Sequence, residues 1–65
     1  MTVRELIKKL EKCNPDAEVC VEAFMDAAAN EVKEYTDGEY SCVYIGDSLE
    51  ELTYMLVEEN GLREI

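Results

Sequence analysis

The dipeptide Asp37-Gly38 constrains the fold of this chain more than any other feature of the sequence. A two-residue type I′ turn needs positive φ at both central positions, and Asp-Gly is one of the pairs that satisfy this requirement. The turn separates two runs, residues 31–36 and 39–45, that alternate in polarity as half-buried strands do. The sequence therefore predicts a β-hairpin. Its predicted cross-strand partners are Thr36 with Glu39, Tyr35 with Tyr40, and Val32 with Val43.

The alternation gives the hairpin two unlike faces, one aliphatic and one that carries tyrosines among charged residues. Residues 17–24 alternate in the same way and predict a third strand. We expect the aliphatic face to lie beneath helices, which leaves the tyrosine face uncovered. The aliphatic face comprises Val19, Val21, Val32, Val43 and Ile45; the tyrosine face comprises Glu18, Cys20, Glu22, Phe24, Glu31, Lys33, Tyr35, Tyr40, Cys42 and Tyr44.

Two predicted helices flank these strands. The first covers residues 3–13, because Thr2 and Glu5 form a capping box before an apolar stripe at helical spacing. Asn14-Pro15 ends it, since proline disfavours helical geometry at the preceding residue. A second capping box, Ser48 with Glu51, opens the other helix. The apolar face of this helix is predicted to comprise Leu49, Leu52, Met55 and Leu56. Its stop signal is Asn60-Gly61, with Leu62 placed to fold back. Residues 25–30 are predicted to form a loop or a single helical turn.

The order helix, three strands, helix predicts an α+β domain. Sixty-five residues make one small domain, residues 1–65, with room for one thin core. The simplest two-layer arrangement is a three-stranded antiparallel meander with both helices on one face. A one-residue slip in the hairpin would exchange the two faces, so the assignment of faces depends on the register.

The sequence carries few of the groups that catalysis or metal binding needs. Histidine is absent, and the three cysteines, Cys13, Cys20 and Cys42, form no CxxC pair. These spacings argue against a disulfide framework and a structural zinc site, although a Cys20–Cys42 bridge stays open for an oxidised sample. No glycine-rich phosphate loop and no Ser/His or Cys/His pair is present. We expect a protein that is not an enzyme and that has no cofactor and no metal.

Two further observations bear on location. No apolar run approaches the roughly 18 residues of a membrane span. Charged residues recur from Arg4 onward, where a signal peptide would have its apolar core. We therefore expect a cytoplasmic protein without a membrane partner.

Charge is distributed unevenly along the chain. Sixteen acidic and six basic residues give a net charge of −10. Residues 1–12 carry a local +2, whereas residues 13–62 carry thirteen acidic side chains against the single base Lys33. Such a body repels nucleic acid and attracts a basic protein surface. The alternative is that the carboxylates serve solubility.

The predicted binding site combines the acidic residues with the tyrosine face. Tyrosine is enriched at the centres of protein interfaces, and a charged rim sets specificity. The alternative is that the rings only stabilise neighbouring strands. A further row of acids is predicted on the exposed side of the second helix: Asp47, Glu50, Glu51, Glu58 and Glu59. The candidate partner-binding residues are Glu18, Glu22, Asp26, Glu31, Glu34, Tyr35, Asp37, Glu39, Tyr40 and Tyr44.

The opening segment, MTVRELIKKLEKCNPDAEVCV (residues 1–21), resembles the start of many short phage and prophage proteins. In these a capped helix of the form TVxELIxxL leads through a PDAEV turn into the first strand. Small acidic phage proteins include the anti-CRISPR proteins, several of which resemble DNA in charge. The resemblance implies an inhibitor in a bacterial host that occupies a basic, nucleic-acid-binding surface of a Cas or other defence protein by acidic DNA mimicry. The alternative is a small structural or regulatory phage protein that forms a homodimer through its tyrosine-bearing sheet face.

Overall fold

The computed structural model describes residues 1–22 and 28–65 and confirms a small α+β domain with two helices. Asp26 and Phe24, and part of the predicted loop at 25–30, lie outside the described residues. The elements in chain order are α1 (Val3–Leu10), β1 (Glu18–Glu22), β2 (Glu31–Thr36), β3 (Ser41–Gly46), α2 (Glu50–Tyr54), the π-helix η1 (Met55–Glu59) and β4 (Arg63–Glu64).

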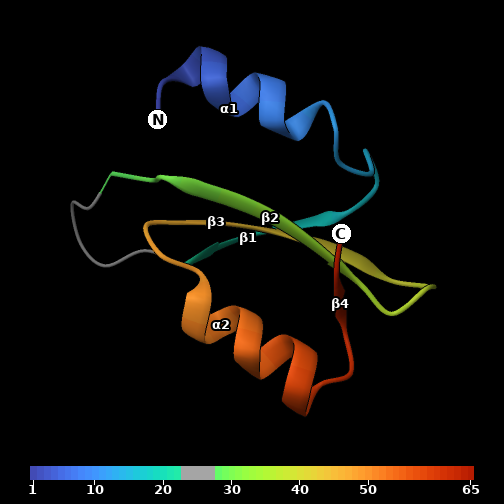
Figure 1. The fold of residues 1–65 in the computed structure, drawn as a ribbon. Coiled ribbons are helices and arrows are strands. Elements are labelled where there is room, and N and C mark those ends of the chain that lie inside the picture. The colour runs from blue at the N-terminus through green and yellow to red at the C-terminus, as the bar shows by residue number, and fades with distance from the viewer. Residues whose placement is uncertain (23–27) are drawn as a thin grey trace.

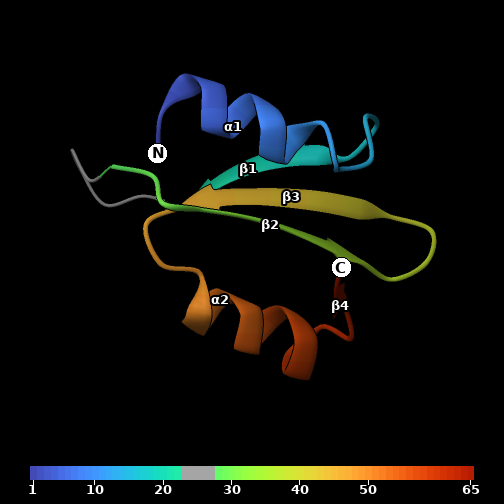
Figure 2. The ribbon, with the colours of Figure 1, turned by 45° about the horizontal axis from the view of Figure 1, so that its top comes forward.

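The sheet is mixed, and its strand order is β1-β3-β2-β4 (Figures 1 and 2). β1 runs parallel to β3, while β2 is antiparallel to both β3 and β4. The predicted three-stranded antiparallel meander is therefore wrong in two respects: β1 pairs with β3 rather than β2, and a fourth strand closes the other edge. Polarity alternation fixes the face to which a side chain belongs, but both edges of a hairpin offer the same two faces to a third strand.

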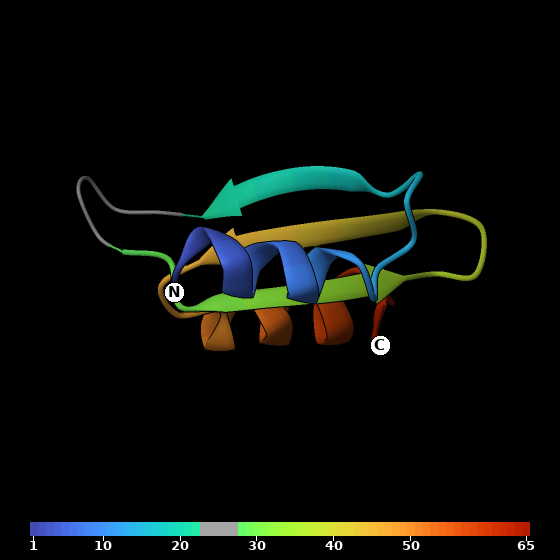
Figure 3. The same cartoon turned by 90° about the horizontal axis from the view of Figure 1, so that it is seen from above.

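The two helices lie on opposite faces of the sheet, so the domain has three layers rather than two (Figures 1 and 3). The prediction that both helices share one face is wrong. Each face of the sheet carries apolar side chains near its centre, Val43 on one and Cys42 on the other, and both are almost fully buried. A single helix of two or three turns cannot cover both, so each helix covers one.

The hairpin register differs from the prediction by two residues. Thr36 pairs with Ser41, and Tyr35 pairs with Cys42, which leaves a turn over residues 37–40. The Asp37 carboxylate accepts hydrogen bonds from the backbone N–H groups of Tyr40 and Glu39 at 2.7 and 2.9 Å, and these bonds lower the pKa of Asp37. This side-chain bonding favours the longer turn. Because the shift is even, every side chain keeps the face that the alternation predicts.

The core lies beneath α2 and η1, on the tyrosine face. Tyr35 is fully buried with Cys42 and Leu56, and Leu52 and Leu62 pack around them. The Tyr35 hydroxyl lies 2.6 Å from Oγ1 of Thr53, whose own hydroxyl donates to the Leu49 carbonyl at 2.7 Å. A hydroxyl has one proton, so Tyr35 is the donor in this chain of bonds. Burial raises the pKa of the Tyr35 hydroxyl.

The ends of the helices are fixed in three different ways. The predicted capping box of Thr2 with Glu5 is confirmed, although α1 ends at Leu10 and the chain turns before Cys13. The predicted Ser48–Glu51 box is wrong: Leu49 is the N-cap of α2, and no side chain of its own helix caps it. The predicted stop is confirmed by Gly61 at φ +71° and by the bond from the Leu62 N–H to the Leu56 carbonyl.

A carboxylate from β2 does the capping at α2. Oε2 of Glu31 accepts a hydrogen bond of 2.6 Å from the backbone N–H of Leu49, which is fully buried. We expect Glu31→Ala to lower the free energy of unfolding by about 1 kcal/mol, as the loss of a helix cap does. Urea unfolding followed by circular dichroism measures the loss. Glu50→Ala removes an exposed carboxylate one residue further on, and an equal loss in that variant would contradict the capping role.

The cysteines are free thiols in this fold. Cys42 is buried, and burial raises the pKa of its thiol. The parallel register places Cys20 beside Tyr44 and Glu18 beside Cys42, so the two cysteines of neighbouring strands lie diagonally to each other. Within the described residues, neither helix has the length and apolar character to cross a bilayer.

Candidate functional site

An open groove lies on the α2 side of the sheet, between the end of β1 and the first turns of α2. It consists of two adjoining hollows of about 380 and 210 Å³ that share Glu22, Glu51 and Leu52. We call it the β1–α2 groove. Its lining residues are Glu22, Asp47, Ser48, Glu51, Leu52, Tyr54 and Met55.

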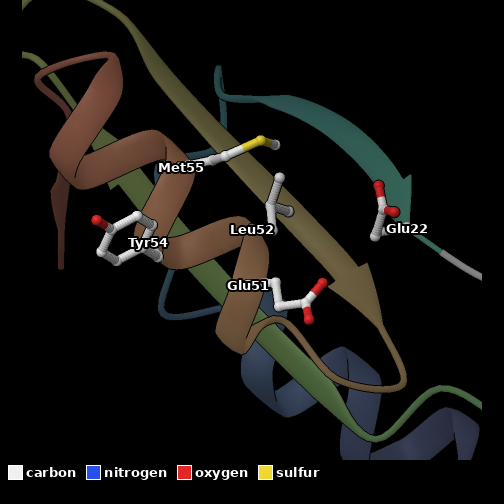
Figure 4. Close-up of a pocket in the computed structure, with 5 residues that line it drawn as sticks. All are labelled: Glu22, Glu51, Leu52, Tyr54 and Met55. Atoms are coloured by element: carbon white, nitrogen blue, oxygen red, sulfur yellow. The ribbon is translucent and has the colours of Figure 1, made fainter.

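Local structure explains how these side chains meet. Glu51 and Met55 are four residues apart on the helix and therefore lie on one side of it. Figure 4 shows these two side chains and Leu52 extending from the helix toward β1, with Glu22 opposite them at the end of the strand. Leu52 and Met55 make the floor apolar, and the carboxylates of Glu22 and Glu51 stand at its rim.

Two large apolar side chains at the groove remain open to water. Tyr54 is 66% exposed and Met55 is 47% exposed, although both belong to the helical segment that covers the core. Exposed aromatic and methionine side chains beside a hollow are typical of a surface that binds a partner.

The groove has no basic side chain among its lining residues. In the part of the chain that the structure describes, the salt bridge found joins Lys33 to Glu64 at 3.0 Å, between β2 and β4. The carboxylates at the rim thus have no basic partner among the residues that line the groove. An apolar floor with a carboxylate rim suits a lysine or arginine side chain, whose aliphatic stem prefers apolar surface while its charged end prefers an anion.

The structure brings three of the predicted site residues together along β1. Glu18 and Glu22 are exposed on the α2 side of that strand, in register with Cys42 and Gly46 of β3. Tyr40 lies in the hairpin turn and donates a hydrogen bond of 3.2 Å from its hydroxyl to Oε2 of Glu18. Partial desolvation, with this bond and the carboxylate charge, raises the pKa of Tyr40.

Other predicted site residues hold the fold together instead. Glu34 is buried and accepts a hydrogen bond of 3.1 Å from the backbone N–H of Asn14, at the end of the first helical segment. Glu31 caps α2, and Asp37 orders the hairpin turn. These three carboxylates are committed to internal donors. Glu39 is exposed in the turn, and Asp26 lies outside the described residues.

The prediction of an uncovered tyrosine face is wrong. Tyr35 is fully buried, and Tyr44 is half-buried with its ring edge-on to Tyr35 at a centroid distance of 5.9 Å. The helical segment α2–η1 packs on this face, where Leu56 and Leu52 contact the buried cluster around Tyr35. A homodimer through this face, the alternative function, would require the α2–η1 segment to leave the sheet. The tyrosine face is therefore not available for that contact in this fold.

The parts of the groove are visible in the sequence, but their proximity is not. Glu51 belongs to the acids predicted on the exposed side of the second helix, while Leu52 and Met55 belong to its predicted apolar face. Tyr54 had no predicted role. The groove forms because β1 lies beside β3. Predicting it from the sequence would therefore have required the correct strand order.

Comparison of the chain with protein-family models, with curated proteins and with solved structures found no match. Within residues 1–22 and 28–65, no group of three or more histidine, cysteine, aspartate or glutamate side chains is placed to hold a metal ion. The groove and the surface that continues it along β1 are therefore the features of the molecule that bear on function.

Proposed function

We propose that this protein is a non-enzymatic binding protein whose β1–α2 groove takes a basic side chain from a protein partner. The observation that carries the proposal is an apolar floor, Leu52 and Met55, rimmed by the carboxylates of Glu22 and Glu51 with no base among the lining residues. An uncharged apolar ligand would leave these carboxylates without a partner, and a simple cation would not use the floor.

The recognition chemistry follows from these groups. The aliphatic stem of an arginine or lysine lies on Leu52 and Met55, and its charged end reaches the two glutamates. Arginine gains further, because its planar guanidinium pairs with carboxylates in a bidentate manner. The net charge of −10 steers a basic partner toward the molecule over longer distances.

The proposed partner is a basic, nucleic-acid-binding surface of a Cas effector or another defence protein of a bacterial host. This is the target that the resemblance of residues 1–21 implies. The protein would act as an inhibitor, with its carboxylates in place of nucleic-acid phosphates. The exposed acids that support this proposal lie on β1, in the loop before α2 and in the first turn of α2: Glu18, Glu22, Asp47, Glu50 and Glu51.

A matched pair of charge reversals tests the proposal. The double variant Glu22→Lys/Glu51→Lys reverses the groove rim, and Glu58→Lys/Glu59→Lys makes the same change of charge on η1, away from the groove. Binding to a panel of purified Cas effectors is measured by surface plasmon resonance at low and high salt, together with inhibition of target-DNA cleavage. We expect the groove variant to bind at least about tenfold more weakly and the control to change by about threefold or less.

The salt response separates specific from purely solubilising charge. Binding should weaken as the salt concentration rises, because exposed charges are screened. Equal effects of the two double variants would show that the groove is not the binding site. A panel in which no effector binds the wild-type chain at low salt would remove the proposed target class.

A further inference from the structure

The outer edge of β1 is the second notable surface of the molecule. β1 is the end strand of the sheet, and its pairing partner is β3. At the opposite end, β4 pairs with β2, and the Ile65 N–H continues that cover with a bond of 2.8 Å to the Glu34 carbonyl. Alternate backbone N–H and C=O groups of β1 point away from β3. Among the described residues, no backbone hydrogen bond reaches them from another segment.

The side chains along this edge are unusually open for a strand. Val19 is 55% exposed and Val21 is 68% exposed. Figure 3 shows the reason: α1 lies along β2 and leaves β1 uncovered on that side of the sheet. Proteins guard a free edge with charged side chains, a proline or a bulge. β1 carries a glutamate at each end but has no proline and no bulge over Glu18–Glu22, where its register with β3 is regular, so its apolar middle stays open. An open apolar edge of this kind favours the addition of another strand.

Charge decides which strand can be added. Glu18 and Glu22 stand at the two ends of β1, both on the α2 side of the sheet. Suppose that β1 of a second copy of this chain paired antiparallel with β1, with the two Cys20 residues opposite each other. Glu18 of each copy would then face Glu22 of the other. Like charges directly opposite each other destabilise a pair of strands, and both copies carry a net charge of −10. Self-pairing is therefore disfavoured, and a strand with basic residues at both ends is favoured.

We propose that β1 accepts, by strand addition, an extended segment of a basic protein in which basic and apolar side chains alternate. This inference rests on the proposed function and specifies the form of its partner. The apolar side chains of the added strand contact Val19 and Val21, and its basic side chains face Glu18 and Glu22. Because Glu22 also lines the β1–α2 groove, the added strand and the groove form one continuous surface. Backbone bonds supply affinity, and the alternation supplies specificity.

A short peptide tests this directly. The probe is a fluorescein-labelled peptide, Arg-Val-Thr-Val-Lys, that contains the proposed alternation. Two further versions of the peptide are N-methylated, one at the two valines and the other at the remaining positions. Each version therefore lacks the backbone N–H groups along one edge of the extended peptide but keeps all its charges. We expect one of the two N-methylated versions to bind at least about tenfold more weakly than the parent peptide in fluorescence anisotropy.

Variants of the protein locate the site. Val21→Lys places a positive charge on the exposed side of β1, and we expect it to weaken peptide binding about tenfold. Val3→Lys makes the same change on α1, at a side chain that is 75% exposed, and should leave binding unchanged. In hydrogen exchange, saturation with the peptide should slow the outward-facing amides of β1 and leave those of β2 unaffected.

Strand addition is wrong if both N-methylated peptides bind as the parent does, if exchange at β1 is unchanged, or if the parent peptide does not bind. In each of these cases, if Glu22→Lys/Glu51→Lys still weakened binding to the effector, the proposed function would be retained. Analytical ultracentrifugation of the chain alone tests the remaining possibility, that a second copy pairs with β1. A dimer that dissociates in the Val21→Lys variant would show that a second copy, and not a basic segment, occupies β1.

Discussion

Tyr35→Ala is expected to leave the protein largely unfolded at room temperature. The Tyr35 side chain is fully buried at the centre of the sheet beneath Leu56, so its removal opens a cavity that the surrounding strands cannot close. Aromatic-to-alanine substitutions in cores cost about 3–5 kcal/mol. In a chain of 65 residues a single core rarely supplies more than about 3–5 kcal/mol of stability, so this loss is about as large as the total. The substitution also leaves the Thr53 hydroxyl without its donor.

Two controls separate the contributions in urea titrations followed by circular dichroism. Tyr35→Phe keeps the ring and removes only the bond to Thr53, so we expect a loss of about 0.5–1.5 kcal/mol. Tyr54→Ala removes a ring that is 66% exposed and should change stability by no more than about 0.5 kcal/mol. A Tyr35→Ala variant as stable as Tyr54→Ala would mean that the core does not lie on the tyrosine face.

Gly46→Ala is the second substitution with a large expected effect. A Cβ at this position would overlap the backbone carbonyl oxygen of Glu22 and lie 2.8 Å from Cδ2 of Leu49. The first of these atoms belongs to the backbone of β1, so a rotamer change cannot relieve the overlap and the ends of β1 and β3 must move apart. Overpacking of this kind costs about 1–3 kcal/mol. Because Glu22 lines the β1–α2 groove, partner binding should weaken as well.

The location of the structural change distinguishes this steric overlap from the backbone strain that alanine causes at a glycine with positive φ. Gly38 has φ +103°, and no atom beyond its two chain neighbours lies within 4 Å of the point that an alanine Cβ would occupy there, so Gly38→Ala strains only its own turn. In amide NMR spectra, Gly46→Ala should shift the signals of β1, including Glu22, whereas Gly38→Ala should shift those of residues 37–40. Unchanged β1 signals in the Gly46→Ala variant would contradict the close approach of the two strands.

The sequence predicts the local structure well because local structure depends on neighbouring residues. The capping box at Thr2, the strand at residues 31–36 and the stop at Gly61 each follow from a few adjacent side chains, and each is confirmed. The division of side chains between the two faces also survives, since a register shift of two residues preserves it.

The arrangement of these elements was not predictable from the same signals. Alternation shows that Val19 and Val21 share a face but does not show whether β1 joins β2 or β3. The choice of the core face failed for a related reason. The prevalence of tyrosine at protein interfaces predicts exposed rings, yet the Tyr35 hydroxyl has a half-buried hydrogen-bond partner in Thr53, which is distant in sequence.

The candidate site was predicted in its charge but not in its position. Of the acidic residues assigned to it, Glu18 and Glu22 remain available on β1, whereas Glu31 and Glu34 accept internal hydrogen bonds. Sequence alone cannot tell a carboxylate that faces solvent from one that caps a helix of another segment. The residues of the second helix line a groove only because β1 lies opposite them.

The parallel pairing of β1 with β3 has a consequence for the order in which the protein assembles. β1 pairs with residues 42–46, about two dozen positions later in the chain, while the β2–β3 hairpin closes over a turn of four residues. Contacts that are distant in sequence form more slowly than local ones. On the ribosome, Val19 and Val21 emerge well before the strand that receives them has been synthesised. During that interval the flanking Glu18 and Glu22 act as gatekeepers, whose mutual repulsion between nascent copies opposes premature aggregation.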